Sequence, residues 1–162
     1  MRNMLIGICA VVLASVPALA QEQQKRAQGQ GYAFVAAGAV NAEEGLLHFG
    51  GGGEAYIRGG FGIGAELGYM AAFRYFGDGI GIFSLNGLYD FGRTGGAKVS
   101  PFVTGGYTLS FRGGTANALN VGGGVHYWFK DRVGLRVEFR DHISPQVCTC
   151  HFWQGRIGFA FR

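Results

Sequence analysis

The sequence contains one local cluster of reactive side chains, Cys148-Thr149-Cys150-His151. Two thiolates and an imidazole are ligands that zinc or copper accepts, so Cys148, Cys150 and His151 are weak candidates for a metal site that lacks an evident fourth ligand. In an oxidising compartment the two cysteines would instead form a local disulfide, which the one-residue spacing would strain and make easily reduced. Free thiols and a bridge between molecules remain as alternatives. We expect a disulfide or free thiols, and we predict no metal and no cofactor.

Two histidines bear on whether the protein is an enzyme that modifies lipids. A lipid deacylase site needs a lipid-facing histidine, a serine two residues later and a nearby carboxylate, so that the imidazole can activate the hydroxyl. At that spacing His126 is followed by Trp128 and His48 by Gly50, neither of which carries a hydroxyl. The sequence therefore predicts no catalytic residue. If the protein is an enzyme of this kind, segment 148–151 is its only candidate site.

The elements that position these residues are predicted to be strands. Eight segments alternate between apolar and polar or small residues, and each is near the ~10 residues that a tilted strand needs to cross a bilayer. In segment 133–140, Arg136, Glu138 and Arg140 share one face, where contact with lipid would cost each about 2 to 4 kcal/mol at mid-depth. These three side chains must therefore face a lumen or water.

We predict an all-β fold, an eight-stranded antiparallel transmembrane β-barrel. The interior of such a barrel is just wide enough to be filled by side chains, so the inward charges should form a paired network rather than line an open channel. We expect this polar network in the lumen to contain Glu54, Arg58, Glu66, His126, Arg136, Glu138, Arg140 and Arg156.

Glycines and aromatic residues complete the strand pattern. Four successive glycines at positions 50–53 predict a bulge or a sharp bend in the second strand. Aromatic residues recur near strand ends, as the two interfacial girdles of a membrane barrel require. The expected girdle residues are Tyr32, Phe61, Phe73, Tyr89, Phe91, Phe102, Phe129 and Phe161.

The two ends of the chain suggest export and membrane insertion. Residues 1–20 combine an early positive charge, a short apolar stretch and a small-residue site, which predicts a signal peptide cleaved after Ala20. Residues 21–31 are predicted to be a flexible periplasmic lead-in, and residues 32–162 the barrel. In the last strand the apolar residues share one face, opposite Gln154 and Arg156, and they would face lipid: Trp153, Ile157, Phe159 and Phe161.

Composition narrows the class of protein. The chain has 31 glycines but 3 prolines, which disfavours helices and suits closely packed, curved strands. Its net charge of +4 is dispersed rather than gathered in basic runs, which argues against a nucleic-acid partner. Alternation alone does not say which face is inside, so a soluble antiparallel barrel or sandwich with its apolar face inward is an alternative.

The segments 121–129, 133–140 and 157–161, together with the export signal, resemble the small eight-stranded outer-membrane β-barrel family that includes the membrane domain of OmpA and OmpX. The resemblance implies an outer-membrane location and a last strand, carrying Trp153, Ile157, Phe159 and Phe161, that acts as an assembly signal. It also implies outer-membrane lipids, the barrel-assembly machinery and periplasmic chaperones as partners.

We expect an integral outer-membrane protein of Gram-negative type, with a structural or surface-interaction role and a side-chain-filled lumen. Short loops, at about 41–45, 74–79, 112–118 and 141–151, would contact any extracellular ligand. The alternative function is a narrow pore for ions or small solutes, gated by Arg136, Glu138 and Arg140. A third hypothesis is an outer-membrane lipid-modifying enzyme.

Overall fold

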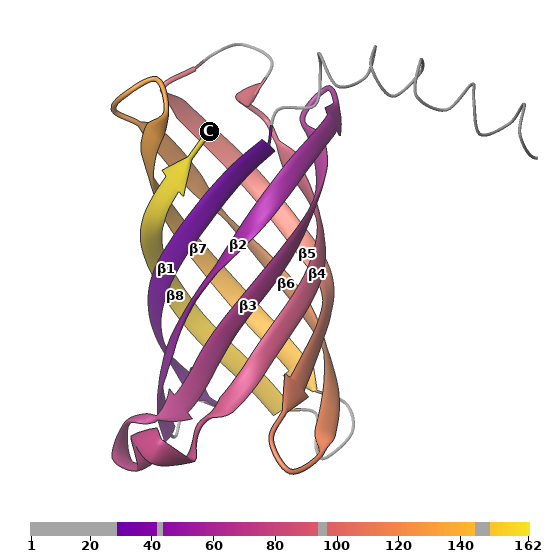
Figure 1. Cartoon of the computed structure of the whole chain (residues 1–162), viewed down its shortest axis with the longest axis vertical. Coiled ribbons are helices and arrows are strands. Elements are labelled where there is room, and N and C mark those ends of the chain that lie inside the picture. Colours follow the sequence, from indigo (N-terminus) through magenta and orange to yellow (C-terminus); the bar gives the residue numbers. More distant parts are fainter. Residues whose placement is uncertain (1–28, 42–43, 94–96, 145–149) are drawn as a thin grey trace, which may run out of the picture.

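Eight antiparallel strands close into a single barrel in chain order, β1 to β8, with β8 paired to β1 (Figure 1). The computed structural model describes residues 29–41, 44–93, 97–144 and 150–162. Within them the elements are β1 (Gly29–Val40), β2 (Glu44–Arg58), β3 (Phe61–Ala72), the 3₁₀ helix η1 (Phe73–Asp78), β4 (Ile80–Asp90), β5 (Val99–Phe111), β6 (Thr115–Trp128), β7 (Val133–Ser144) and β8 (Cys150–Phe161). The predicted all-β, eight-stranded fold is confirmed.

The strands bury their polar face and expose their apolar face. On β7, Arg136 and Arg140 are 2% and 0% exposed, whereas Val137 and Phe139 between them are 48% and 54% exposed. Such a distribution is stable only where the surroundings are apolar and the interior can pair its charges. The alternative of a soluble barrel with an apolar interior is therefore wrong. Among the described residues, no helix has the length and apolarity that crossing a membrane would require.

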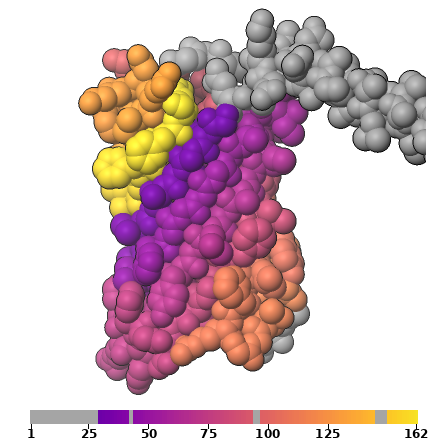
Figure 2. Space-filling model, viewed as in Figure 1, coloured from indigo at the N-terminus to yellow at the C-terminus, as the bar shows by residue number. Residues whose placement is uncertain are grey.

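The two rims of the barrel differ, and we name them by what they carry. At the termini end, β1 begins, β8 ends and the turns β2–β3 and β6–β7 lie close by (Figure 1). At the opposite rim, the loop end, lie η1 and the β5–β6 hairpin. In the space-filling view of Figure 2 the strands on the visible face form an unbroken wall between these rims.

The strand boundaries differ from the sequence prediction at several places. β2 begins at Glu44 and β6 at Thr115, so the predicted loops 41–45 and 112–118 are shorter than expected. β1 begins at Gly29, three residues before the predicted start of the barrel at position 32. β7 continues to Ser144 and β8 begins at Cys150, so most of the predicted loop 141–151 is strand. The proposed signal peptide and most of the predicted lead-in, residues 1–28, lie outside the described residues.

The glycine run at 50–53 is regular strand, not the predicted bulge or bend. It pairs without interruption to β1 and β3, and the register shift of β2 falls later, between Tyr56 and Arg58. Gly52 and Gly50 face the lumen opposite Tyr32 and Phe34 of β1, and a Cβ on Gly52 would lie 2.9 Å from the Tyr32 ring. These glycines make room for two inward aromatic rings.

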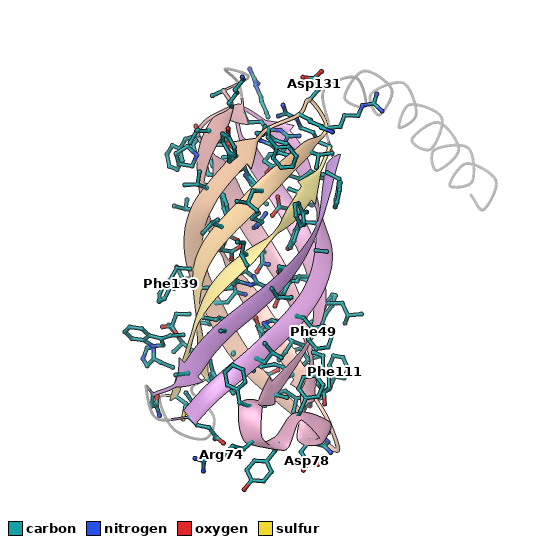
Figure 3. All side chains as sticks on the ribbon, turned by 90° about the vertical axis from the view of Figure 1, so that its left-hand side faces the viewer. Phe49, Arg74, Asp78, Phe111, Asp131 and Phe139 are labelled. Atoms are coloured by element: carbon teal, nitrogen blue, oxygen red, sulfur yellow. The ribbon has the colours of Figure 1, made fainter. Side chains whose placement is uncertain are left out.

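Aromatic girdles surround both rims. Figure 3 shows Phe49, Phe111 and Phe139 projecting outward from the wall. Two residues predicted for the girdles, Tyr32 and Phe102, lie instead in the lumen, 6% and 2% exposed. The exposed aromatic residues toward the termini end include Phe61, Phe91, Tyr127, Phe129, Phe159 and Phe161, and those toward the loop end include Phe49, Phe73, Tyr75, Phe76, Tyr107, Phe111 and Trp153.

Candidate functional site in the barrel lumen

A network of three arginines and three glutamates crosses the middle of the lumen. The six side chains come from β2, β3, β7 and β8, and none is more than 6% exposed. The ion pairs are Arg136–Glu54 at 2.7 Å, Arg136–Glu138 at 2.9 Å, Arg140–Glu138 at 2.5 Å, Arg140–Glu66 at 3.4 Å, Arg156–Glu66 at 2.6 Å and Arg156–Glu138 at 3.3 Å.

Glu138 is the centre of this network because all three guanidinium groups reach it. Arg136 and Arg140 lie two positions before and after it on β7, so the three side chains share the inward face. Arg156 lies opposite Glu138 on β8, in register. Each carboxylate is thereby held by at least one arginine, which offsets the cost of placing charges in a low-dielectric interior.

Aromatic rings support the arginines from the side. The guanidinium of Arg136 lies 4.3 Å from the ring centres of both Tyr32 and Phe102, and that of Arg156 lies 3.6 Å from the ring centre of Phe34. Such cation–π contacts add to the ion pairs, and the rings occupy space that water would otherwise fill. This packing explains why Tyr32 and Phe102 point inward.

Toward the termini end the lumen is filled by hydrogen-bonded polar groups. Gln30 donates to Glu54 at 2.6 Å, and His126 lies 3.5 Å from the carboxylate of Asp90, which also accepts a hydrogen bond from Ser100. His126 is fully buried between the rings of Phe102 and Trp128. At the rim itself, guanidinium groups cover two inward rings: Arg93 over Tyr56 and Arg162 over Trp128.

Toward the loop end the charges give way to hydroxyl and imidazole groups. Thr108 bonds to Ser84 at 2.9 Å and to Nδ1 of His142 at 3.1 Å, and His48 bonds to Gln154 at 2.8 Å. Beyond this layer a cavity of about 440 Å³ occupies the loop end of the lumen.

Arg58 is not part of the lumen network. It is the last residue of β2 and is exposed, because the register shift after Tyr56 ends the alternation that had placed it on the inward face. The prediction was wrong at this position. The structure brings Glu54, Glu66, Arg136, Glu138, Arg140 and Arg156 together and places His126 beside them, within 3.2 Å of Arg136.

The side chains of Cys150 and His151 lie on opposite faces of β8. Cys150 lines the lumenal cavity and is disulfide-bonded. His151 lies on the outer face, where its Nδ1 is 2.6 Å from Asp141. Neighbouring residues of a strand point to opposite sides, so these two cannot bind one metal ion between them. Cys148 lies outside the described residues, and those that are described contain no group of three metal-binding side chains.

The barrel has paired charges inside and apolar side chains outside, which is the reverse of a soluble protein and is typical of a membrane barrel. The sequence model described as "Outer membrane protein beta-barrel domain" matches residues 6–161. The chain belongs to this outer-membrane β-barrel family. The family implies a location in the outer membrane, and the predicted resemblance is confirmed.

Solved structures agree with this barrel fold. The N-terminal β-barrel domain of OprF from Pseudomonas aeruginosa is similar with a TM-score of 0.64 and 16% identity, over 83% of this chain and 98% of that one. Neisserial surface protein A is similar with a TM-score of 0.58 and 16% identity, over 82% of this chain and 94% of that one. Ail, the attachment invasion locus protein of Yersinia pestis, is similar with a TM-score of 0.50 and 8% identity, over 82% of this chain and 95% of that one. No curated protein sequence matches the chain.

In this outer-membrane barrel, the last strand presents an apolar outer face. Trp153, Ile157, Phe159 and Phe161 on β8 are each 50 to 54% exposed, while Gln154 and Arg156 are buried. These four side chains therefore lie where a membrane or an assembly factor would contact them.

Several lumenal residues of the barrel were not identified from the sequence. Tyr32 and Phe34 were missed because β1 is apolar or small on both faces, so alternation does not reveal which side is inward. The glycines opposite them were the available signal. Phe102 faces Gly124 in the same way, and in each case an inward glycine on the neighbouring strand leaves room for a ring.

Proposed function

We propose that this protein is an integral outer-membrane barrel with a structural or surface-interaction role and a lumen closed by its own side chains. The observation that carries the proposal is the central network, in which three arginines and three glutamates are all buried and paired. Ions crossing the barrel would have to separate these pairs. Breaking a buried pair costs about 3 to 5 kcal/mol, so the closed lumen is the stable state.

The partners follow from the surfaces. The exposed apolar wall and its two aromatic girdles suit outer-membrane lipids. The outer face of β8 suits the barrel-assembly machinery, after delivery by periplasmic chaperones. With the termini in the periplasm, η1 and the β5–β6 hairpin would face the exterior and contact any extracellular ligand.

A conductance measurement tests the closed lumen. The purified barrel is inserted into a planar bilayer, and current is recorded for the unaltered protein and for Glu138→Ala. We expect no steady conductance from the unaltered protein, because the pairs hold one another in place. Asp131→Ala, in the exposed β6–β7 turn, is the control for the removal of a carboxylate outside the lumen.

A steady channel in the unaltered protein, with a conductance that changes in Glu138→Ala but not in Asp131→Ala, would contradict the proposal. That result would establish the alternative function, a narrow pore gated by Arg136, Glu138 and Arg140.

A further inference from the structure

The cavity at the loop end of the lumen has an apolar wall, unlike the rest of the interior. Met70 of β3, Ile80 and Ile82 of β4, and Phe152 of β8 line it, and Thr108 and His142 lie at its inner end. Further polar residues line the rest of the cavity: Ser110, Arg112, Thr115, Asn117 and Ser144. Met70 and Ile82 are 7% and 2% exposed, so they belong to the inner surface of the barrel. Its volume of about 440 Å³ is in the range of pockets that hold small ligands.

The apolar lining is not required to fill the barrel. Apolar side chains that surround a space, rather than filling it, lose packing contacts and leave apolar surface exposed to water. This exposure costs about 25 cal/mol of free energy for each Å² of apolar surface. The charged centre of the same lumen is filled by ion pairs and stacked rings. The cavity therefore has the composition of a binding pocket: a largely apolar wall with a small number of polar groups.

The floor of the cavity indicates the charge of its ligand. The network beneath it pairs three arginines with three glutamates, so this network presents no net charge to an ion. Arg112, the one charged residue in the described part of the lining, is paired with Asp78 at 2.8 Å, so its charge is also compensated. His142 is 4% exposed, and while its Nδ1 bonds to Thr108, its Nε2 has no hydrogen-bond partner among the described residues. A buried polar atom of this kind is stabilised by one hydrogen bond.

We propose that the loop end of the lumen binds an uncharged, mainly apolar small molecule with one hydrogen-bonding group, of the chemical class of a medium-chain aliphatic alcohol. The apolar part contacts Met70, Ile82 and Phe152. The polar group lies at the inner end, beside His142. The network below closes the pocket, so the ligand enters and leaves at the loop end.

Methyl NMR in lipid nanodiscs can test this, because the reporters are already in the chain. Met70 is the only methionine beyond position 4, and Ile82 gives a second methyl inside the cavity. Ile57 and Ile63 face outward, 57% and 60% exposed, and they report on nonspecific partition into lipid. Decanol and decanoate are titrated as neutral and charged probes of equal chain length.

We expect decanol to shift the methyl signals of Met70 and Ile82 saturably, while Ile57 and Ile63 change only in proportion to the amount added. Decanoate should bind at least about tenfold more weakly, a difference of 1.4 kcal/mol. Signals of Met70 and Ile82 that do not saturate, or that only follow Ile57 and Ile63, would overturn the pocket. Equal binding of decanoate would overturn the assignment of a neutral ligand.

A matched pair of variants locates the binding. Ala118 lines the cavity, whereas Leu119 next to it faces outward with 60% exposure. Ala118→Phe should fill the pocket and weaken decanol binding at least about tenfold, and Leu119→Phe should leave it unchanged. Ala116→Leu, also in the lining, serves if Ala118→Phe does not fold. Undiminished binding in a folded cavity variant would contradict the proposed location.

Discussion

Arg136 and Glu54 meet across the lumen from β7 and β2, two strands that share no hydrogen-bonded edge, with 2.7 Å between Nη1 and Oε1. The contact links two strands that are separated by β8 and β1 around the barrel, which backbone hydrogen bonds alone cannot do. Both side chains are almost fully buried, so neither charge can be rescued by water when the other is removed.

Glu54→Gln should lower the free energy of unfolding by about 3 to 5 kcal/mol, because it leaves part of the charge of Arg136 uncompensated in the interior. Urea unfolding in the presence of lipid vesicles measures this difference. The control is Asp78→Asn, which breaks the exposed Arg112–Asp78 pair and should cost under about 1 kcal/mol. Equal effects of the two substitutions would mean that the lumenal pair is solvated.

Gly52→Ala should destabilise the barrel by about 1 to 3 kcal/mol, because the added methyl group meets the Tyr32 ring and the Ala65 carbonyl oxygen. Gly53→Ala, one position along, is the control: its Cβ would have only the Gln30 oxygen near it, at 3.8 Å, so we expect a change within about 0.5 kcal/mol. Unfolding in urea compares the two. If Gly53→Ala is the more harmful, the assignment of inward and outward faces on β2 is reversed.

Val137→Arg should lower the free energy of unfolding by about 2 to 4 kcal/mol, because it places a charge on the lipid-facing side of β7, away from the rims. Phe129 lies just beyond the end of β6, at the rim. The charge introduced by Phe129→Arg should lower the free energy of unfolding by no more than about 1 kcal/mol. The same unfolding assay distinguishes them, and a penalty independent of depth would argue against a membrane at this position on the barrel.

The purified barrel should retain no stoichiometric zinc after dialysis, since Cys150 and His151 face opposite sides of β8. Metal analysis after incubation with zinc provides the measurement. Stoichiometric zinc that is lost in His151→Ala would show that residues around the β7–β8 connection form a site that the described residues do not.

Phe159→Gln should reduce the amount of assembled barrel in cells more than Phe139→Gln does. The two side chains are equally exposed, at 54%, but only Phe159 lies on the last strand. The faster migration of unboiled, folded barrel on a gel gives the assembled fraction, and refolding of both variants into vesicles controls for stability. Equal losses of assembled barrel in cells would contradict the role of β8 as an assembly signal.

Much of the fold and the centre of the site could be predicted from the sequence. Charged residues at alternate positions of a membrane strand must face the lumen, because the other face contacts lipid. Arg136, Glu138 and Arg140 are the example. A segment without charge carries less information, which is why the inward direction of Tyr32 and Phe102 was not found.

The ends of strands were harder to predict for a different reason. Near the rims both faces of a strand meet polar surroundings, so alternation fades although the backbone pairing continues. Asp141 and His142 thus looked like loop residues but belong to β7. At Arg58 the opposite error arose, because a register shift ended the pattern one residue before the sequence suggested.

The contribution of Arg156 from β8 has a consequence for how the barrel forms. Glu66 and Glu138 arrive earlier in the chain, and each receives part of its compensation from this last strand. An open, incomplete sheet would expose those carboxylates with too little positive charge beside them. Addition of β8 to the sheet therefore also completes the neutralisation of the interior, which favours closure of the barrel and disfavours a stable seven-stranded intermediate.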